Sequence, residues 1–538
     1  MTCNLRKVPR LFERSDNWTQ VRVRRADVFL SRTSLPGNVR LASHFAKESN
    51  KSKGEASIEP NALLQQLQAR GLLQDLTSRA VHQHLSSAKR TIYLGVDPSA
   101  SSLHVGNLLP LLALVHFTLA GHSALLLVGG ATGSIGDPSG RSKERNALDP
   151  ETLNDNIKSI ETQVNNILHN VQGYLERRRV SYSRDTKPTT LERASVASAD
   201  MPSARLRIEV INNAEWYQGV GVLRFLTDVG RYARMSDMLA RESVASRLGA
   251  RNSSDDQSSE PIGMSFTEFS YQLLQAYDFS VLHDGPYQCT LQLGGSDQLG
   301  NIMAGVQLIL RKHNSTQPSR SEQKDDILPA YGITVPLLTT SNGAKFGKSA
   351  GNAIWLDPKL LSDYDLYQYF WRSTDADVHK FLNALTLLPL EEVERIMQRH
   401  RQDPSKRIAQ EALALEILEL VRGPKAVQRA RDAQKVLFGS GLESLKVQDI
   451  KAAFDNDPKM VRLTREAFEG VDILAICVTA QATKSRGEAR RLVHNGGVYL
   501  NNVAVKDTAF KLSQDSLLKG VFCVLRIGKS DHRILVVE

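Results

Sequence analysis

The chain has 538 residues, of which 41% are hydrophobic and 23% are charged. This balance is typical of globular proteins and excludes a wholly disordered, collagen-like or fibrous chain. At roughly 150 residues per domain, the length predicts two to four domains. No apolar run reaches the roughly 18 residues that a membrane-spanning helix needs, so we do not expect a membrane as a partner.

Most of the excess positive charge lies in the first tenth of the chain. Residues 1–53 contain 12 Lys and Arg against 4 Asp and Glu, which is +8 of the formal net charge of +10. An Arg-rich, acid-poor start with several serines is typical of a mitochondrial transit peptide. We therefore expect residues 1–55 to be a basic leader that directs the chain to the mitochondrial matrix. The alternative is a basic tail that contacts nucleic acid.

The cysteine content is low and the cysteines are widely spaced. Their spacing matches no zinc motif, and four cysteines are too few for a disulfide scaffold in a chain of this length. We expect a reducing compartment and no protein-bound metal. The four are Cys3, Cys289, Cys477 and Cys523.

Two short apolar runs with a helical pattern between them predict a βαβ unit near the start of the folded region. The runs are Thr91–Val96 and Ala124–Val128, and residues 106–120 lie between them. Such a unit implies a parallel sheet. Further strand candidates lie at residues 208–211, 289–293 and 333–337. We expect residues 56–375 to form one α/β domain with a doubly wound, Rossmann-like parallel sheet.

Polar stretches that contain few apolar residues interrupt this domain, and we interpret them as surface insertions. They lie near residues 175–205, 249–262 and 312–327. Leucines at helical spacing with charges between them predict a helical domain at residues 376–460. Residues 465–538 predict a small α+β module that ends in two apolar, strand-like runs.

The first candidate site follows the first predicted strand. In a parallel sheet, ligands bind outside the carboxyl ends of the strands, where helix N-termini present free N–H groups. His104 and Asn107 lie three residues apart and share one helical face, and Gly106 leaves room for a ring or a ribose. These residues could hold the phosphates and the sugar of a nucleotide. Taken alone, they fit an ordinary capped helix equally well.

The second candidate is the run Lys345–Ser349, which reads KFGKS. Its two lysines and its serine hydroxyl could neutralise charge that develops on a leaving pyrophosphate. A P-loop is the rival interpretation, but the glycine spacing from Gly343 is one residue short of that motif. A solvated basic loop is the other alternative.

Together these motifs resemble the two signatures of class I aminoacyl-tRNA synthetases. Three further stretches, residues 129–140, 265–278 and 292–298, resemble the tyrosyl-tRNA synthetases in particular, in the order of that family. The likeness covers roughly residues 60–538 and leaves out the leader and the insertions. It implies an enzyme that joins L-tyrosine to ATP as tyrosyl-adenylate, releases pyrophosphate, and passes tyrosine to tRNA-Tyr. ATP would enter with Mg²⁺ as a substrate complex, with no tightly bound cofactor.

The resemblance also implies a tyrosine-binding set. Tyr93 and Asp278 would contact the phenol hydroxyl of the substrate, and a site built in this way disfavours phenylalanine because its buried polar groups would stay unpaired. Asp137, Tyr271 and Gln275 would surround the α-ammonium group. The remaining members of this set are Gln292, Gln298 and, behind the pocket, Asn213.

An ATP-binding set and a catalytic set follow in the same way. The ATP-binding set is Asp97, Ser99, His104, Gly106, Asn107, Gly295, Asp297 and Lys348. The residues expected to stabilise the α-phosphate and the pyrophosphate are His104, Asn107, Arg141, Arg145, Lys345, Lys348 and Ser349. Asn107 replaces a second histidine found in many family members, and asparagine can still donate a hydrogen bond but cannot become charged.

The last module resembles the S4 RNA-binding domain. Its predicted RNA-binding residues are Lys484, Arg486, Arg490 and Arg491, which would present cations to a tRNA backbone. A solvated basic helix is the alternative. The family is homodimeric, and by the family pattern Phe266 would lie near the interface between subunits.

Three other functions stay open at this point. Some fungal mitochondrial members of the family also bind group I intron RNA through an N-terminal extension and insertions, and Lys47, Lys51 and Lys53 could belong to such a surface. The chain could also be an RNA-binding protein built on an inactive core. A tryptophan-specific enzyme is the third alternative, and Tyr93 with Asp278 argues against it.

Overall fold

The computed structural model describes most of the chain beyond residue 58. The described residues are 59–139, 148–185, 206–249, 263–316, 328–341, 343, 346, 348–349, 352–438, 444–454, 457, 459–528 and 531–538. The predicted leader, Arg141, Arg145 and Lys345 lie outside these ranges, as do most residues of the three polar stretches.

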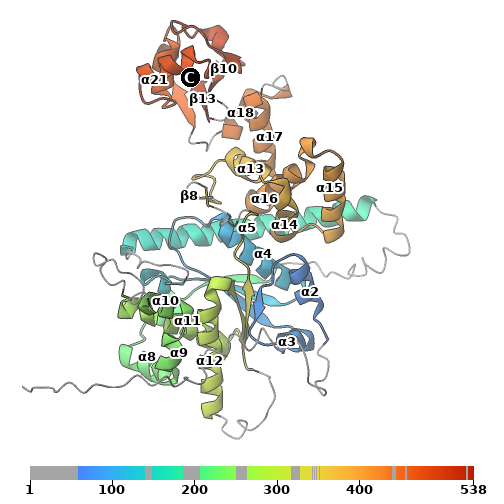
Figure 1. Cartoon of the computed structure of the whole chain (residues 1–538), viewed down its shortest axis with the longest axis vertical. Helices are drawn as coiled ribbons and strands as arrows, with labels where there is room; N and C mark the ends of the chain where they lie inside the picture. The colour runs from blue at the N-terminus through green and yellow to red at the C-terminus, as the bar shows by residue number, and fades with distance from the viewer. Residues whose placement is uncertain are drawn as a thin grey trace, which may run out of the picture. The chain divides into compact units, whose positions relative to one another are not determined.

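A six-stranded sheet with the order β1-β6-β5-β2-β3-β4 forms the centre of the first domain (Figure 1). Only β1 runs antiparallel to its neighbour, β6; the other pairs are parallel. The strands are β1 Asp75–Leu76, β2 Thr91–Val96, β3 Ser123–Val128, β4 Ile208–Asn212, β5 Cys289–Gly295 and β6 Tyr331–Val335. The chain therefore winds outward in both directions from β2, which confirms the predicted doubly wound sheet.

The last strand needs one correction. It was expected at residues 333–337 but spans Tyr331–Val335. Pro336 follows directly and has no N–H to donate to a neighbouring strand, so the hydrogen-bonded ladder ends before it.

The central strand β2 presents alternate side chains to opposite faces of the sheet, as strand geometry requires. Ile92 and Leu94 join a core with helices α4 and α5. Tyr93 points to the other face, where Phe279 of α11 and Ile302 of α12 cover it. The helices of these two layers are α2 Ala62–Ala69, α3 Val81–Ser87, α4 Val105–Leu119, α5 Pro150–Asp185, α11 Phe266–Asp284 and α12 Leu299–Thr316.

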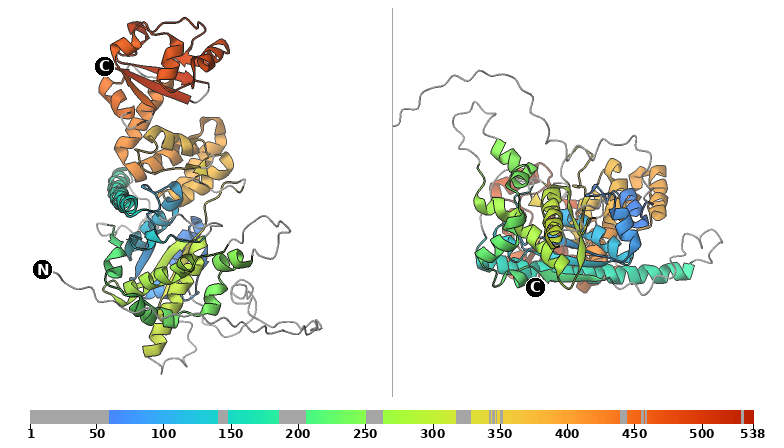
Figure 2. Two further views of the ribbon diagram at one scale, coloured as in Figure 1. Left: turned by 90° about the vertical axis from the view of Figure 1, so that its left-hand side faces the viewer. Right: turned by 90° about the horizontal axis from the view of Figure 1, so that it is seen from below.

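Helix α5 corrects the predicted start of the first polar stretch. Residues 175–185 were assigned to an insertion, but they continue α5 as one long helix (Figure 2). Arg177 forms an ion pair with Glu419 at 2.7 Å and Arg178 forms one with Glu416, and both glutamates lie on α16. These contacts with a distant segment stabilise the end of α5, whose composition alone predicts a loop. Residues 312–316 of the third polar stretch are likewise helical, as the end of α12.

In the described residues, six α-helices follow the sheet and form the helical domain. They are α13 Asp363–Trp371, α14 Asp375–Leu385, α15 Leu390–Gln402, α16 Ile408–Arg422, α17 Pro424–Phe438 and α18 Val447–Phe454. The bundle thus begins before residue 376, the expected boundary. Ser362 caps α13, since its hydroxyl accepts the Asp365 N–H at 3.1 Å.

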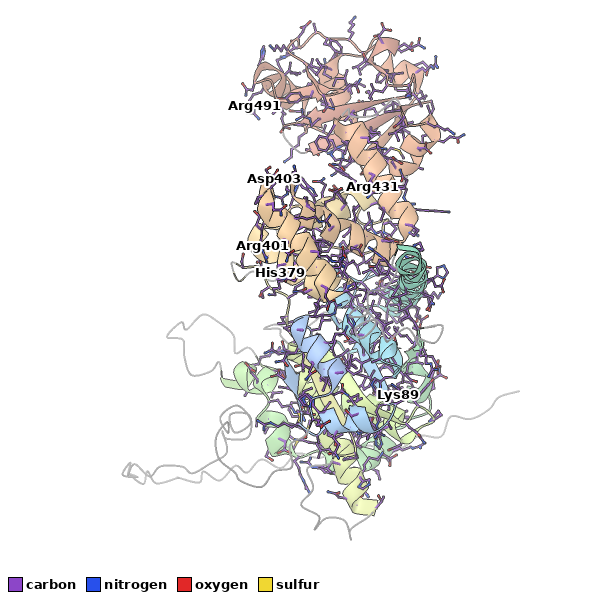
Figure 3. All side chains as sticks on the ribbon, turned by 90° about the vertical axis from the view of Figure 1, so that its right-hand side faces the viewer. Lys89, His379, Arg401, Asp403, Arg431 and Arg491 are labelled. Carbon is purple, nitrogen blue, oxygen red and sulfur yellow. The ribbon has the colours of Figure 1, made fainter. Side chains whose placement is uncertain are left out.

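An ionic cluster with a buried aspartate joins three helices of the helical domain, α13, α16 and α17. Asp363 accepts hydrogen bonds from Arg422 at 2.9 Å and from Arg429 at 2.6 Å. Surface pairs contribute less to stability, because water screens them. Examples lie on the side of the bundle where Figure 3 labels His379 and Arg401, which contact Glu394 at 2.8 and 3.9 Å.

The C-terminal domain is a five-stranded sheet, of order β11-β10-β12-β13-β9, with small helices on one face. Its elements are β9 Met460–Leu463, α19 Arg465–Phe468, α20 Ile473–Thr479, α21 Arg486–His494, β10 Val498–Leu500, β11 Val503–Ala504, β12 Phe522–Ile527 and β13 Asp531–Val537. Cys523 and Leu525 pack under these helices. Phe522 and Val524, on the opposite face, pack against Phe454 of α18.

Four short helices connect β4 to α11: α7 Ala214–Tyr217, α8 Val222–Asp228, α9 Met235–Leu239 and α10 Glu242–Gly249. Among the described helices, none has the length and apolar character needed to cross a membrane.

Candidate active site

The candidate site lies at the carboxyl ends of β2 and β5. These two strands are neighbours, and the chain leaves them toward opposite sides of the sheet, so a crevice opens at their ends. Asp97 follows β2 directly, and Asp297 follows β5. Helix α11 passes over the same region on the face that Tyr93 occupies.

The inner end of the site contains two buried polar atoms without a hydrogen-bond partner among the described residues. Tyr93 and Gln292 are register partners on the parallel strands β2 and β5, and their side chains are 1% and 2% exposed. Neither Tyr93 Oη nor Gln292 Oε1 has a hydrogen-bond partner within the described part of the chain. Leaving a buried polar atom unpaired costs roughly 1–3 kcal/mol. Two such atoms side by side therefore fit a ligand that carries a hydrogen-bonding group on an otherwise apolar body.

Asp278 is the buried acid of this inner end. It is 2% exposed, and its carboxylate accepts hydrogen bonds from Asn213 Nδ2 at 3.1 Å and Trp216 Nε1 at 2.9 Å. Burial raises the pKa of the Asp278 carboxyl from 3.8 to about 7, although these hydrogen bonds act in the opposite direction. Burial and the neighbouring Asp278 also raise the pKa of Tyr93 well above 10. Tyr93 therefore stays a neutral hydroxyl that can donate and accept.

Asn213 connects Asp278 to the glycine-rich loop after β3. It is fully buried; its amide oxygen accepts the Ala131 N–H at 2.8 Å, and its Nδ2 also donates to Thr132 Oγ1 at 3.0 Å. A Cβ at Gly129 would lie 2.5 Å from both Asp97 Oδ1 and Thr132 Oγ1. The loop can therefore approach Asp97 only with glycine at this position.

Asp97 and Tyr271 meet at the mouth of the inner end. Tyr271 Oη donates to Asp97 Oδ2 at 2.8 Å, and Thr132 Oγ1 donates to Asp97 Oδ1 at 3.3 Å. Burial, with the nearby Asp97 and Asp137 carboxylates, raises the pKa of Tyr271 well above 10. The structure thus brings Asp97, expected in the ATP-binding set, against Tyr271, expected in the tyrosine-binding set.

A polar cluster surrounds Asp137 at the outer end. Gln298 Nε2 donates to Asp137 Oδ2 at 2.6 Å, and Gln275 Nε2 donates to Gln298 Oε1 at 3.2 Å. The Ser139 N–H donates to Asp137 Oδ1 at 2.9 Å. A carboxylate with amide oxygens close by can accept the three N–H groups of a primary ammonium ion.

Asn301 is a member of this cluster that the sequence interpretation missed. Its Nδ2 lies within hydrogen-bond distance of Asp137 Oδ1 at 3.2 Å, Gln275 Oε1 at 3.1 Å and Gln298 Oε1 at 3.4 Å. The signal was present, because Asn301 on α12 follows Gln298, which directly precedes that helix, by three residues. Trp216 was missed in the same way, three residues after Asn213.

His104 and Asn107 lie at the N-terminus of α4. The His104 N–H donates to Asn107 Oδ1 at 3.0 Å, which is one half of a capping box. The Asn107 side chain therefore fixes the start of α4, and its amide nitrogen remains the group that could donate to a ligand. The Ser99 N–H donates to Asp97 O at 2.8 Å, so Ser99 lies in the turn after β2. Gly106 packs directly against the His104 ring, since a Cβ there would come within 2.9 Å of His104 Cε1.

The hairpin with Lys348 and Ser349 is described for its backbone only, as strand β7, Lys348–Ser349, paired with β8, Asn352–Ala353. The chain then reaches Ile354, whose carbonyl accepts the Val105 N–H at 2.9 Å. The hairpin is thus joined to the start of α4.

Asp297 lies close over Gly295, because a Cβ on Gly295 would be 2.5 Å from Asp297 Oδ1. Arg141, Arg145 and Lys345, predicted for the same chemistry, fall outside the described ranges.

Comparison with known proteins decides the family. The family described as tRNA synthetases class I (W and Y) matches residues 86–439, which is more than half of the chain. The chain belongs to the class I tyrosyl-tRNA synthetases. Its C-terminal residues 449–535 match the SYY-like C-terminal domain of tyrosine–tRNA ligases, which argues against the tryptophan-specific alternative.

Full-length relatives support the same assignment. The tyrosine–tRNA ligase of Roseiflexus castenholzii is 38% identical over 478 residues, which cover 88% of this chain and 99% of that protein. The mitochondrial tyrosine–tRNA ligase of Drosophila melanogaster is 38% identical over 457 residues, or 84% of this chain and 89% of that protein. A C-terminally truncated mitochondrial tyrosyl-tRNA synthetase of Aspergillus nidulans superposes with a TM-score of 0.57 at 32% identity, covering 74% of this chain and 97% of the other. The chain is thus a tyrosine–tRNA ligase by family.

The C-terminal domain of this synthetase carries the four predicted RNA-binding cations. Lys484 lies just before α21, and Arg486, Arg490 and Arg491 lie on it, all of them exposed. Figure 3 shows Arg491 at the margin of this domain. Arg486 forms an ion pair with Asp472 at 2.9 Å.

We predict that Asn301→Ala raises the KM for tyrosine about tenfold in ATP–pyrophosphate exchange. The change removes a donor shared by Asp137, Gln275 and Gln298, and tenfold corresponds to about 1.4 kcal/mol, the scale of one lost hydrogen bond. Gln307→Ala, on the same helix but away from the site, is the matched control. An unchanged KM for tyrosine in Asn301→Ala would contradict the role of this cluster.

We also predict that tyrosine binding weakens as the pH falls below about 7. Asp278 with a pKa of about 7 is protonated in the free enzyme below that pH, and it must lose its proton to accept the phenol O–H. Because the folded-state pKa lies above the unfolded value, this residue also makes stability fall as the pH rises from about 4 to about 7. Equilibrium dialysis of tyrosine from pH 5.5 to 8.5 checks the first effect. Asp278→Asn should show a flat profile, and a flat profile in the unaltered chain would contradict the assignment.

Proposed function

We propose that this enzyme charges mitochondrial tRNA-Tyr in two steps within the site at the ends of β2 and β5. The main support for this proposal is the difference between the two ends of the site. Tyr93, Gln292 and Asp278 form a buried inner end with unpaired polar atoms, and the Asp137 cluster forms an outer end suited to an ammonium group. L-Tyrosine has matching groups at the same two ends.

The proposed inner end explains selection against phenylalanine. The phenol hydroxyl would donate to the Asp278 carboxylate and accept from Tyr93 Oη, which satisfies both. Phenylalanine would leave these buried groups unpaired, and sites of this kind reject the analogue that lacks the hydroxyl by roughly 10⁴- to 10⁵-fold. Phe279 packs against Tyr93, with 5.2 Å between the two ring centroids, and supplies apolar surface beside the Tyr93 ring.

In the activation step, a carboxylate oxygen of tyrosine attacks the α-phosphorus of ATP. The bond to the bridging oxygen breaks, and pyrophosphate leaves with the electron pair. We assign ATP binding to the start of α4 and the end of β5, where Ser99, Gly106, Gly295 and Asp297 lie. The proposed donors to the α-phosphate and the pyrophosphate are His104, Asn107, Arg141, Arg145, Lys345, Lys348 and Ser349, which would act by stabilising charge. Mg²⁺ would arrive with ATP as part of the substrate complex.

In the transfer step, a hydroxyl of the 3′-terminal ribose of tRNA attacks the tyrosyl carbonyl carbon, AMP leaves, and the hydroxyl loses its proton. We assign part of the tRNA contact to Lys484, Arg490 and Arg491 on the C-terminal domain. Their exposure supports phosphate binding, which should weaken as the salt concentration rises.

The first function test is tyrosine-dependent ATP–pyrophosphate exchange by the chain without residues 1–55. We predict exchange with tyrosine but not with phenylalanine or tryptophan. Tyr93→Phe removes only one hydroxyl and should lower discrimination against phenylalanine by roughly tenfold to a hundredfold, while Asp278→Ala should abolish exchange. No exchange from a folded chain would instead favour the alternative of an RNA-binding protein on an inactive core.

We further propose that the enzyme is a homodimer. Several large apolar side chains are exposed on the short helices between β4 and α11 and at the start of α11, and we assign them to the interface. Among them are Val222 at 74%, Leu223 at 82% and Phe266 at 79%. Exposed apolar patches of this kind mark interaction surfaces. A second copy of the chain, related by a twofold axis, is the commonest partner for such a patch.

We predict that the double variant Leu223→Asp with Phe266→Asp is a monomer, since each change places a charge in the proposed interface. Sedimentation equilibrium measures the mass directly. Val503→Asp, at another exposed apolar side chain but on the C-terminal domain, should leave the dimer intact. A double variant that remains dimeric would rule out this surface as the interface.

We place the enzyme in the mitochondrial matrix. The basic, acid-poor residues 1–55 and the likeness to mitochondrial ligases support this location. Fusing residues 1–55 to a fluorescent protein tests it.

Group I intron splicing is a second candidate, favoured by the basic residues before the core. Lys47, Lys51 and Lys53 fall outside the described residues. Intron binding that is lost when residues 40–60 are deleted, with tRNA charging intact, would separate this role from aminoacylation.

A further inference from the structure

The helical domain holds the segment that leads into the β7–β8 hairpin. Asp377 of α14 accepts two hydrogen bonds from Ser341, one from its N–H at 2.7 Å and one from its hydroxyl at 3.2 Å. Asp377 is 4% exposed, and Thr374 Oγ1 fixes its carboxylate with a further hydrogen bond at 2.8 Å. Lys380, one turn along α14, donates to Thr339 O at 3.0 Å.

Phe346 extends the same attachment to within two residues of β7. Its ring lies 4.1 Å from the Phe381 ring on α14 and 5.2 Å from the Tyr369 ring on α13, measured between centroids. Its N–H donates to Leu338 O at 2.8 Å. Aromatic pairs at this separation each contribute about 0.5–1.5 kcal/mol beyond the surface that they bury.

The segment that leaves the hairpin is held from the helical domain as well. The Leu356 N–H donates to Leu103 O at 2.9 Å, directly before His104. Arg422 of α16 donates from Nε to Leu356 O at 3.0 Å, while its Nη1 donates to Asp363 at 2.9 Å. Both flanks of the hairpin are therefore attached to the helical domain, one through α13 and α14 and the other through α16, and the second flank is also attached to the start of α4.

We propose that Asp377 is a positioning residue for tyrosine activation. By holding Ser341, it sets where the hairpin with Lys348 and Ser349 stands relative to His104 at the start of α4. Asp377 is a charged acceptor that the helical domain directs at residues 339–346, the segment that leads into the hairpin. Charge-assisted hydrogen bonds are about twice as strong as neutral ones. The inference rests on the proposed catalytic role of Lys348 and Ser349.

The physical basis is preorganisation of the cations. Groups that stabilise charge in a transition state are effective only when they are held at the correct distance, and a displacement of about 1 Å can cost on the order of a hundredfold in rate. The tyrosine pocket is built from β2, β5, α11 and α12, and Asp377 contacts none of these elements in the described structure. Loss of Asp377 should therefore affect the chemical step and leave tyrosine binding intact.

The test is ATP–pyrophosphate exchange with the full dimeric chain, without tRNA. We predict that Asp377→Ala lowers kcat about tenfold to a hundredfold while the KM for tyrosine stays within twofold. Asp377→Asn should recover most of the rate, because its amide can accept the Ser341 N–H and donate to the Ser341 hydroxyl. Asp375→Ala is the matched control on the same helix, since Asp375 contacts His400 and Gln410 instead of the hairpin flank.

Lys348→Ala, measured in the same assay, separates the catalytic role of the hairpin from the positioning role of Asp377. If Lys348→Ala keeps its full exchange rate, the proposed catalytic role of the hairpin fails. If Lys348→Ala is inactive and Asp377→Ala is unchanged, the positioning role alone is overturned. A parallel rise in the KM for tyrosine in Asp377→Ala would also overturn it, because that result indicates general loss of structure.

Should Asp377→Ala fail to fold, the double variant Ser341→Ala with Lys380→Met provides the same test with smaller changes. It removes one hydrogen bond to Asp377 and the one to Thr339 O, and it leaves the Asp377 carboxylate in place. We expect a kcat that falls at least threefold at unchanged KM for tyrosine. A kcat equal to that of the unaltered chain would overturn the proposal.

Discussion

Burial of the Asp278 carboxyl is the constraint on which the rest of the site depends. A carboxyl group without water must be hydrogen-bonded or neutral, and this one receives donors from Asn213 and Trp216 and has its pKa raised to about 7. Asn213 in turn holds Ala131 and Thr132 of the glycine-rich loop. The loop that carries Asp137 to the outer end is thus positioned from the inner end, so the two ends of the pocket are built as one network.

A second network fixes the catalytic elements relative to the sheet. The start of α4 is capped by Asn107 and joined through backbone hydrogen bonds to the segment after β8, which Arg422 holds from the helical domain. The segment that leads into the β7–β8 hairpin is held by Asp377, which accepts the Ser341 N–H. An enzyme that must place several cations around a leaving pyrophosphate benefits from such attachment, because each cation is then held in place before the reaction begins.

Much of the architecture could be predicted because short, local patterns of apolar and polar residues determine it. The apolar runs of β2 and β3 and the pattern between them were enough for the parallel sheet. The end of α5 was not predictable, because Arg177 and Arg178 are stabilised by glutamates more than two hundred residues away. The site shows the same division. Asn301 and Trp216 were missed although each lies three residues after a predicted site residue, because their partners Gln275 and Asp278 on α11 come near only in the fold. The start of the helical domain was placed too late because α13 is short and aromatic.

We propose that Tyr93 and Asp278 together recognise the phenol of tyrosine. A crystal structure of the chain with bound L-tyrosine tests it most directly. We expect the phenol oxygen within about 3.2 Å of both Tyr93 Oη and an Asp278 carboxylate oxygen, which is ordinary hydrogen-bond distance. A tyrosine bound with its phenol oxygen away from both groups would contradict it.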